Sequence, residues 1–200
     1  MTVNDRPFGF LISESLRLSE INERRIQRRL SDLAGQFHDG TALRSLIEAG
    51  NPVAYEVLEV RRPEREGELL CGLSILYPGL VGGEYFMTKG HYHAVRATAE
   101  IYYCLSGAGL LLMENHQGEW TAEELRPGRV VYVAPGWAHR SINTSPDQQL
   151  VTFFVYPAHA GHDYGTIETC GFRKLVLCRN GAPDIVDNPA WQGTPVAEEV

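Results

Sequence analysis

From residue 53 onward, short apolar runs alternate with turn residues along the chain. Gly, Pro, Asn or charged residues separate the runs, which are rich in β-branched and aromatic residues. The runs are VAYEVLEVRR, LCGLSILYPG, IYYCLSGAGLLLME, RVVYVAPG, QLVTFFVYP and FRKLVLCRN. Many short strands without helices between them predict a mainly β domain, either a sandwich or a barrel.

Before residue 53 the apolar spacing changes and predicts helices. Residues 19–37 carry Ile21, Ile26, Leu30, Leu33 and Phe37 at roughly helical spacing. The segment ERRIQRR would form the solvated face of this helix, and contact of its arginines with phosphate is the less favoured alternative. The segment TALRSLIEAG predicts a second helix that ends at its glycine.

These patterns divide the chain into three parts. We expect a helical extension in residues 1–52, packed on a main β domain in residues 53–180. Residues 181–200 show no clear period, so we expect a surface tail anchored by Trp191.

Composition and charge narrow the classes of partner. The chain has 200 residues and a net charge of −7, which argues against nucleic acid and anionic membranes as partners. An anionic substrate would need a local positive centre, such as a metal ion. There is no long apolar run or secretory signal pattern, and the four cysteines form no CxxC pair, so we expect reduced thiols and a cytoplasmic location.

The segment TKGHYHAVRATAE carries candidate metal ligands. On a strand, His91 and His93 would share one face about 6.6 Å apart, so both can bind one ion. Glu100 has the wrong parity for that face, which predicts a bend within AVRATA. In the following strand, alternate residues would point inward (Glu100, Tyr102, Cys104) and toward the packing side (Ile101, Tyr103, Leu105).

A fourth ligand comes from the segment PGWAHRSIN, in which His139 follows a Pro-Gly turn. Three histidines and one carboxylate suit a divalent first-row metal: iron, manganese, nickel, cobalt or zinc. A lone HxH pair or a lone histidine after a turn also occurs without metal, so the joint pattern carries the hypothesis.

The joint pattern resembles the paired signature of the cupins, which are small jelly-roll barrels with a metal inside. It reads HxH, six residues, Glu100, six residues and Gly107, and later Gly128, His139 and Asn143. Two departures are the six-residue gap after His93 and the position of Pro135. The longer gap is similar to that of the cupin-type glucose-6-phosphate isomerases, and residues 53–191 resemble that family in several further segments.

The resemblance implies a cupin jelly-roll barrel and a site with defined roles. It implies that one divalent ion, with Fe²⁺ favoured over Mn²⁺, Ni²⁺ or Zn²⁺, is bound by His91, His93, Glu100 and His139. It also implies a pocket for a sugar phosphate, lined by Ser74, Thr88, Gly90, Tyr102, Tyr156, His162 and Tyr164. A homodimer is expected because the family forms dimers and because exposed strand edges favour pairing.

The chemistry of aldose–ketose isomerisation suits these residue types. Thr88, Lys89 and Gly90 could provide donors for the substrate phosphate. His162 is a candidate proton carrier because imidazole titrates near neutral pH. Tyr156 is a candidate for orienting the reacting oxygens or relaying a proton, and Glu100 for a base as well as a ligand.

Other functions remain open at this point. A related isomerase acting on mannose 6-phosphate would differ only at C2 of the sugar. A metal-dependent dioxygenase could use the same ligands, although the polar pocket disfavours it. A sensor of sugar phosphates without catalysis is a further alternative, because one fold hosts many functions.

Overall fold

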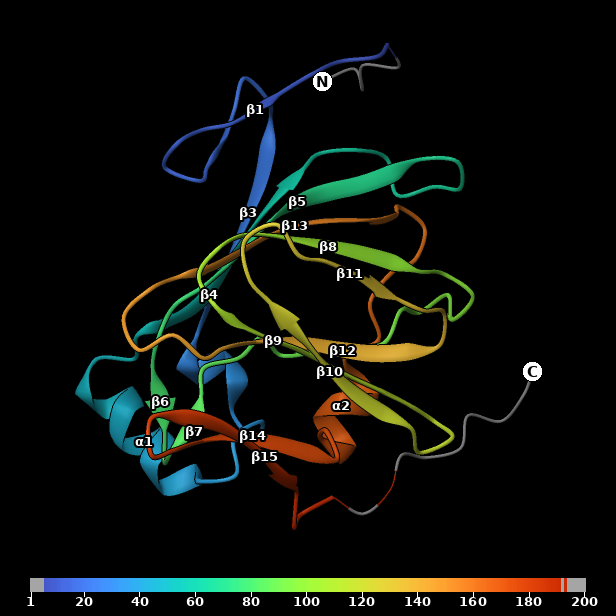
Figure 1. Cartoon of the computed structure of the whole chain (residues 1–200). Helices are drawn as coiled ribbons and strands as arrows, with labels where there is room; N and C mark the ends of the chain where they lie inside the picture. Colours follow the sequence, from blue (N-terminus) through green and yellow to red (C-terminus); the bar gives the residue numbers. More distant parts are fainter. Residues whose placement is uncertain (1–5, 192, 194–200) are drawn as a thin grey trace.

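The computed structural model describes residues 6–191 and 193, and these form a mainly β protein with few helices (Figure 1). This confirms the predicted class. No helix in the described part of the chain is long and apolar enough to cross a membrane.

A six-stranded antiparallel sheet forms the largest layer, in the order β11-β8-β13-β5-β4-β3. Its strands are β3 (Glu23–Arg29), β4 (Val53–Val60), β5 (Leu69–Leu76), β8 (Glu100–Ser106), β11 (Val130–Val133) and β13 (Leu150–Pro157). Five of the six coincide, to within one residue at their starts, with apolar runs that predicted strands. The exception is β3.

A three-stranded sheet, β10-β9-β12, contributes the other side of the metal-ligand group. It consists of β9 (Gly109–Asn115), β10 (Trp120–Leu125) and β12 (Trp137–Asn143). One large apolar cluster includes residues of both sheets, such as Leu111 and Ile142 from the smaller sheet and Leu76 and Phe154 from the larger. The candidate site therefore lies between two sheets that share a core.

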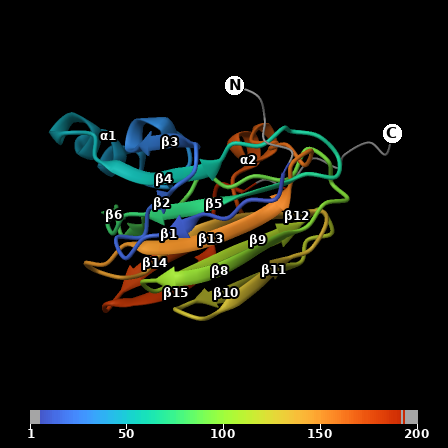
Figure 2. The same cartoon turned by 90° about the horizontal axis from the view of Figure 1, so that it is seen from above.

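The remaining elements lie around these layers (Figures 1 and 2). A four-stranded sheet, β15-β14-β7-β6, and a short hairpin, β1-β2, complete the strands of the described residues. These strands are β1 (Leu11–Ile12), β2 (Leu18–Ser19), β6 (Leu80–Val81), β7 (Glu84–Tyr85), β14 (Lys174–Arg179) and β15 (Ala182–Asp187). The helices are η1 (Leu30–Leu33), α1 (Gly40–Ala49) and α2 (Gly165–Cys170).

The second predicted helix is confirmed as α1. The side chain of Asp39 accepts hydrogen bonds from the backbone N–H groups of Thr41 and Ala42, which satisfies free donors at the helix start. Gly50 ends the helix, as predicted.

The predicted helix over residues 19–37 is wrong. This segment forms the edge strand β3, followed by the single turn η1. Along β3 the alternate residues Arg24, Ile26 and Arg28 are half-buried, whereas Arg25, Gln27 and Arg29 are exposed. Because the inward face carries two arginines, the strand has no apolar–polar alternation in its sequence, and the apolar residues that remain mimic a helical period.

The two ends of the chain differ from the expected extension and tail. Of the expected extension, the structure describes residues 6–52, which contribute β3 to the large sheet and are only partly helical; of the expected tail, residues 192 and 194–200 lie outside the described part. The tail begins with β15, which pairs with β14, and Trp191 lies against the guanidinium of Arg173, 4.4 Å from its ring centre. Within the described residues, β11 and β3 end the large sheet and do not pair with one another, so the pairings alone do not close a barrel.

Glu56 holds the N-terminal elements against the sheet. It lies on β4 with only 2% of its surface exposed. Arg25 and Gln27 of β3, Tyr77 after β5 and Arg17 of the β1–β2 hairpin donate hydrogen bonds to its carboxylate. Burial opposes ionisation, but the hydrogen bonds from Arg25, Gln27 and Tyr77 outweigh it and lower the pKa of Glu56.

We therefore expect Glu56→Gln to lower the free energy of unfolding by about 1–3 kcal/mol at pH 7. Because the pKa of Glu56 is lower in the folded protein, the ionised carboxylate stabilises the fold at pH values above its ordinary pKa of 4.5. This stabilisation is lost as the pH falls through the pKa of the folded state. Urea unfolding at a series of pH values should show that the difference in free energy of unfolding between the wild type and Glu56→Gln shrinks as the pH falls below 4.5. Glu124→Gln, at an exposed carboxylate, is the control. Equal effects of the two substitutions would contradict this role of Glu56.

Candidate active site

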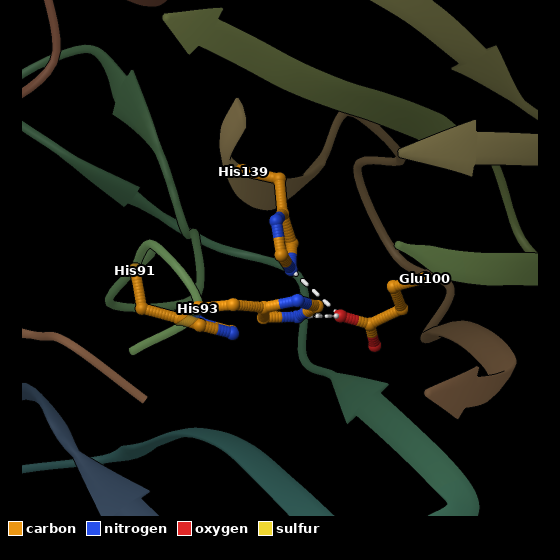
Figure 3. A group of neighbouring side chains, drawn as sticks. All are labelled: His91, His93, Glu100 and His139. Atoms are coloured by element: carbon orange, nitrogen blue, oxygen red, sulfur yellow. Dashed lines mark hydrogen bonds and ion pairs between the residues drawn. The ribbon is translucent and has the colours of Figure 1, made fainter. Parts of the chain in front are cut away.

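Four side chains from three parts of the chain form the metal-ligand group (Figure 3). His91 and His93 lie in the connection between β7 and β8, Glu100 begins β8, and His139 lies on β12. One ligand atom of each lies within 4.8 Å of the others. The predicted set of ligands therefore comes together in space and can hold a metal ion.

Local backbone structure explains this convergence. His91 and His139 exchange backbone hydrogen bonds of 3.2 and 3.0 Å, which fix the HxH segment to β12. Residues 94–97 form the predicted bend, so that Glu100 points back toward the histidines. The HxH segment itself is joined by isolated bridges and is not a regular strand as expected.

The predicted alternation along β8 holds on its inner face only. Tyr102 and Cys104 are buried beside Glu100, as predicted. Leu105 packs against a second apolar cluster, but Ile101 and Tyr103 are 43% and 39% exposed. The prediction of a packing side was therefore wrong for these two residues, because the β1–β2 hairpin contributes to an apolar cluster with β4, β5 and β13 that does not include them.

The hydrogen bonds of His93 leave a free ring nitrogen for a metal. The Thr98 hydroxyl donates to the carbonyl of Val95 at 2.6 Å, and both oxygens of Thr98 lie close to His93 Nδ1, at 2.9 and 3.2 Å. Nδ1 must therefore carry the proton, which leaves the lone pair on Nε2, 3.1 Å from Glu100 Oε2. Such outer contacts are typical of histidines that bind metals.

The electrostatics of the group also suit a cation. Nε2 of His91 is buried and has no hydrogen-bond partner in the structure. Burial, followed by the charges of the neighbouring histidines, lowers the pKa of His91 well below its usual range. Burial opposes ionisation of Glu100, but His139 and His93 outweigh it and lower its pKa to about 2. Neutral imidazole and ionised carboxylate are the forms that bind a metal.

The ligand group borders a cavity of about 270 Å³. All of the predicted pocket residues except Lys89 line it: Ser74, Thr88, Gly90, Tyr102, Tyr156, His162 and Tyr164. The Lys89 ammonium group instead forms an ion pair with Glu168 and lies 5.2 Å from the ring centre of Tyr164. The role of Lys89 as a donor to the substrate therefore stays a prediction.

Several pocket residues were missed by the sequence reasoning. Arg24, Arg28, Tyr55 and Glu59 all line the cavity, the two arginines from β3 and the other two from β4. The signal for Tyr55 and Glu59 was available, because they share parity on a strand that was predicted correctly. The arginines could not be found in this way, because their strand was assigned as a helix.

Arg140 holds the segment before His91 from behind. It follows His139 on β12, is 2% exposed, and donates hydrogen bonds to the carbonyl of Lys89 and to Gln36. Its guanidinium lies 4.3 Å from the ring centre of Phe172. Only glycine suits position 90. Its φ is +76°, and an added Cβ would lie 2.6 Å from Phe172 and 3.1 Å from Arg140.

His162 lies exposed at the cavity, beside the ligand group. Its ring centre is 4.4 Å from that of His91, and it stacks on Tyr164 at 5.5 Å. The surrounding protein displaces solvent and lowers the pKa of His162 to about 4. The backbone next to it pairs with Tyr92, and Arg96 Nη2 lies 2.6 Å from Asp163 Oδ2, so its position is held by the HxH segment.

Fold and site together define a mainly β protein with a buried three-histidine, one-carboxylate group that opens into a polar cavity. The family model of glucose-6-phosphate isomerase matches residues 27–191. The chain therefore belongs to the glucose-6-phosphate isomerase family.

Individual relatives agree with this assignment. The glucose-6-phosphate isomerase of Thermococcus litoralis is 46% identical, over 93% of this chain and 97% of its own. That of Pyrococcus horikoshii is 48% identical, over 84% and 89%. Among solved structures, oxalate decarboxylase from Bacillus subtilis overlaps 55% of this chain and 26% of its own, at 18% identity and a TM-score of 0.42.

We expect His139→Ala to weaken binding of a divalent ion by about 100-fold or more, because even the loss of an outer contact of a ligand weakens binding by about 10–100-fold. Metal content after EDTA treatment and dialysis against Mn²⁺ measures this effect. His38→Ala, at an exposed histidine after η1, is the control and should retain the ion. Equal metal content in the two variants would contradict the assignment of His139 as a ligand.

Proposed function

We propose that this protein is a metal-dependent isomerase that interconverts D-glucose 6-phosphate and D-fructose 6-phosphate. The observation that carries the proposal is the convergence of the ligand group, Tyr156 and His162 on one polar cavity in a member of this family. We also infer that the two facing sheets correspond to a cupin-type jelly roll.

One divalent ion would be held by His91, His93, Glu100 and His139. When bound, it would polarise the sugar carbonyl as a Lewis acid. Fe²⁺ is our first choice because imidazole and carboxylate ligands both suit it, with Mn²⁺, Ni²⁺, Zn²⁺ or Co²⁺ as alternatives.

The phosphate end of the substrate would lie beside Arg28. Burial raises the pKa of Tyr55, and the neighbouring Lys89 backbone and Arg28 oppose that shift, so Arg28 and Tyr55 lie close together. Among the ion pairs of the described residues, none involves Arg28, whose charge is therefore available to an anion. Thr88 and Gly90 line the same cavity and would add hydroxyl and backbone donors.

Proton transfer would be shared among three residues. The pKa of His162, lowered to about 4, keeps its imidazole neutral at neutral pH, so it would act as a weak base that returns its proton readily. The pKa of Glu100, lowered to about 2, keeps its carboxylate ionised as ligand and as base at C1 and C2. Tyr156 would contact the reacting oxygens of the sugar.

We further propose a cytoplasmic homodimer. All four cysteines are free thiols, which suits a reducing compartment. The edge pair β8–β11 exposes Ile101, Tyr103, Val130 and Tyr132, an apolar group that pairing of two copies would cover. Light scattering should give twice the mass of one chain.

The first test is a coupled assay for conversion of fructose 6-phosphate to glucose 6-phosphate. We expect activity that is lost after EDTA treatment and restored by a divalent ion, because the ion polarises the substrate. Addition of each metal in turn ranks the candidates. The same assay with mannose 6-phosphate as substrate distinguishes a glucose-6-phosphate isomerase from the related isomerase that acts on mannose 6-phosphate. A metal-loaded protein that is inactive with both substrates would contradict the proposal.

We expect Arg28→Met to raise KM by about 10–100-fold and to leave kcat nearly unchanged, because a hydrogen bond to a charged group contributes about 1.5–3 kcal/mol. Arg29→Met, on the same strand with its side chain exposed, is the matched control. A normal KM for Arg28→Met would place the phosphate elsewhere in the cavity.

A further inference from the structure

Glu59 is a buried carboxylate inside the cavity that the chemistry above does not use. It lies on β4 with 5% of its surface exposed. Its Oε2 accepts a hydrogen bond of 2.9 Å from the hydroxyl of Tyr156, and its Oε1 lies 2.7 Å from Arg24 Nη2. Both carboxylate oxygens are therefore engaged, one by a cation and the other by the tyrosine that faces the cavity.

This contact crosses an intervening strand, and Gly72 makes the crossing possible. Tyr156 is on β13 and Glu59 on β4, with β5 between them. Gly72 of β5 is the backbone partner of both Glu59 and Phe154. A Cβ at Gly72 would lie 2.9 Å from the ring of Phe154 and 2.1 Å from the carbonyl oxygen of Leu58. The missing side chain leaves the inner face of β5 open where the hydroxyl reaches Glu59.

The direction of this hydrogen bond determines what Tyr156 can offer a ligand. A phenol has one proton, and here it is donated to a carboxylate paired with a guanidinium. The remaining lone pairs of the phenolic oxygen are available for other contacts, and Tyr156 lines the cavity. Tyr156 is thus set to accept a hydrogen bond from a substrate hydroxyl.

We propose that Glu59 is a positioning residue that makes Tyr156 a reversible proton acceptor for the sugar hydroxyl next to the carbonyl. The inference rests on the proposed isomerase function. As that hydroxyl becomes a carbonyl, the hydrogen on its carbon moves to the neighbouring carbonyl carbon in the proposed isomerisation. The hydroxyl proton passes to the oxygen of Tyr156, and the phenolic proton passes to Glu59. The reverse transfers then deliver one proton from Tyr156 to the other sugar oxygen and return the phenolic proton from Glu59. No proton is gained or lost in the cycle.

Arg24 is the positive charge beside Glu59 in this relay. Its side chain is 41% exposed and contacts Glu59 and, at 3.8 Å, the exposed Glu64. A structural explanation of Glu59 would therefore be that it only fastens β3 through Arg24. The two explanations differ in their effects on kcat, because fastening a strand affects folding and substrate binding, whereas the relay affects the chemical step.

The test compares Glu59→Gln with Tyr156→Phe and the double variant, using metal-loaded protein in the isomerase assay. We expect Glu59→Gln to lower kcat by about 10-fold or more, with KM and metal content nearly unchanged. The double variant should be no slower than Tyr156→Phe alone, because both substitutions interrupt one path. Glu64→Gln removes the other carboxylate near Arg24 and is the matched control, which should retain full kcat.

Glu59→Asp provides a second variant if Glu59→Gln folds poorly. It keeps the charge near Arg24 but is one methylene too short to reach Tyr156, so we expect the same loss of kcat. Full kcat in either folded variant, or independent additive losses in the double variant, would overturn the relay while the isomerase function stands. A wild-type protein that is inactive with every metal would overturn the proposed function and the relay with it.

Discussion

The carboxylate of Glu100 joins the two sheets at the centre of the molecule. It is 3% exposed and lies 3.1 Å from His93 Nε2 and 2.9 Å from His139 Nε2. A buried carboxylate destabilises a fold unless positive charge or hydrogen bonds compensate it. Here His93 from the connection before β8 and His139 from β12 in the smaller sheet face the carboxylate, and a divalent ion held by the same group would compensate its charge. The same pairing that lets the sheets meet therefore builds a site for a divalent ion.

The two faces of β12 contribute to the site in different ways. His139 and Ser141 face the cavity, while Arg140 points the other way and holds the carbonyl of Lys89. Burial lowers the pKa of Arg140 to about 10 against the influence of Glu84 and Glu114, so its side chain remains a cation at neutral pH. Because this cation fixes the backbone next to Gly90, the segment that carries Thr88 and His91 is supported from behind.

The inner face of the large sheet is polar where β3 and β4 border the cavity. Arg24, Arg28 and Glu59 point inward there, whereas the opposite face of β4 places Leu58 and Val60 in an apolar cluster that includes Leu18 of the β1–β2 hairpin. The side of the sheet that faces the interior of the protein is therefore polar here, whereas interior-facing sides of sheets are usually apolar. Since Arg24 is paired with Glu59, Arg28 is the cation that would face the phosphate of the proposed substrate, in a protein whose net charge is −7.

Much of the fold and the ligand group follows from local sequence pattern. Strands β4, β5, β8, β9, β11, β13 and β14 coincide with apolar runs between turn residues, and the parity of His91, His93 and Glu100 required the bend that the structure contains. Tertiary structure decided what local pattern cannot encode. β3 is a strand because the edge of β4 was available to pair, and the ammonium group of Lys89 is turned toward Glu168, with which it forms an ion pair. Arg28 and Glu59 line the cavity because strands that are distant in sequence come together around it, and no local pattern marks a polar side chain as facing such a cavity.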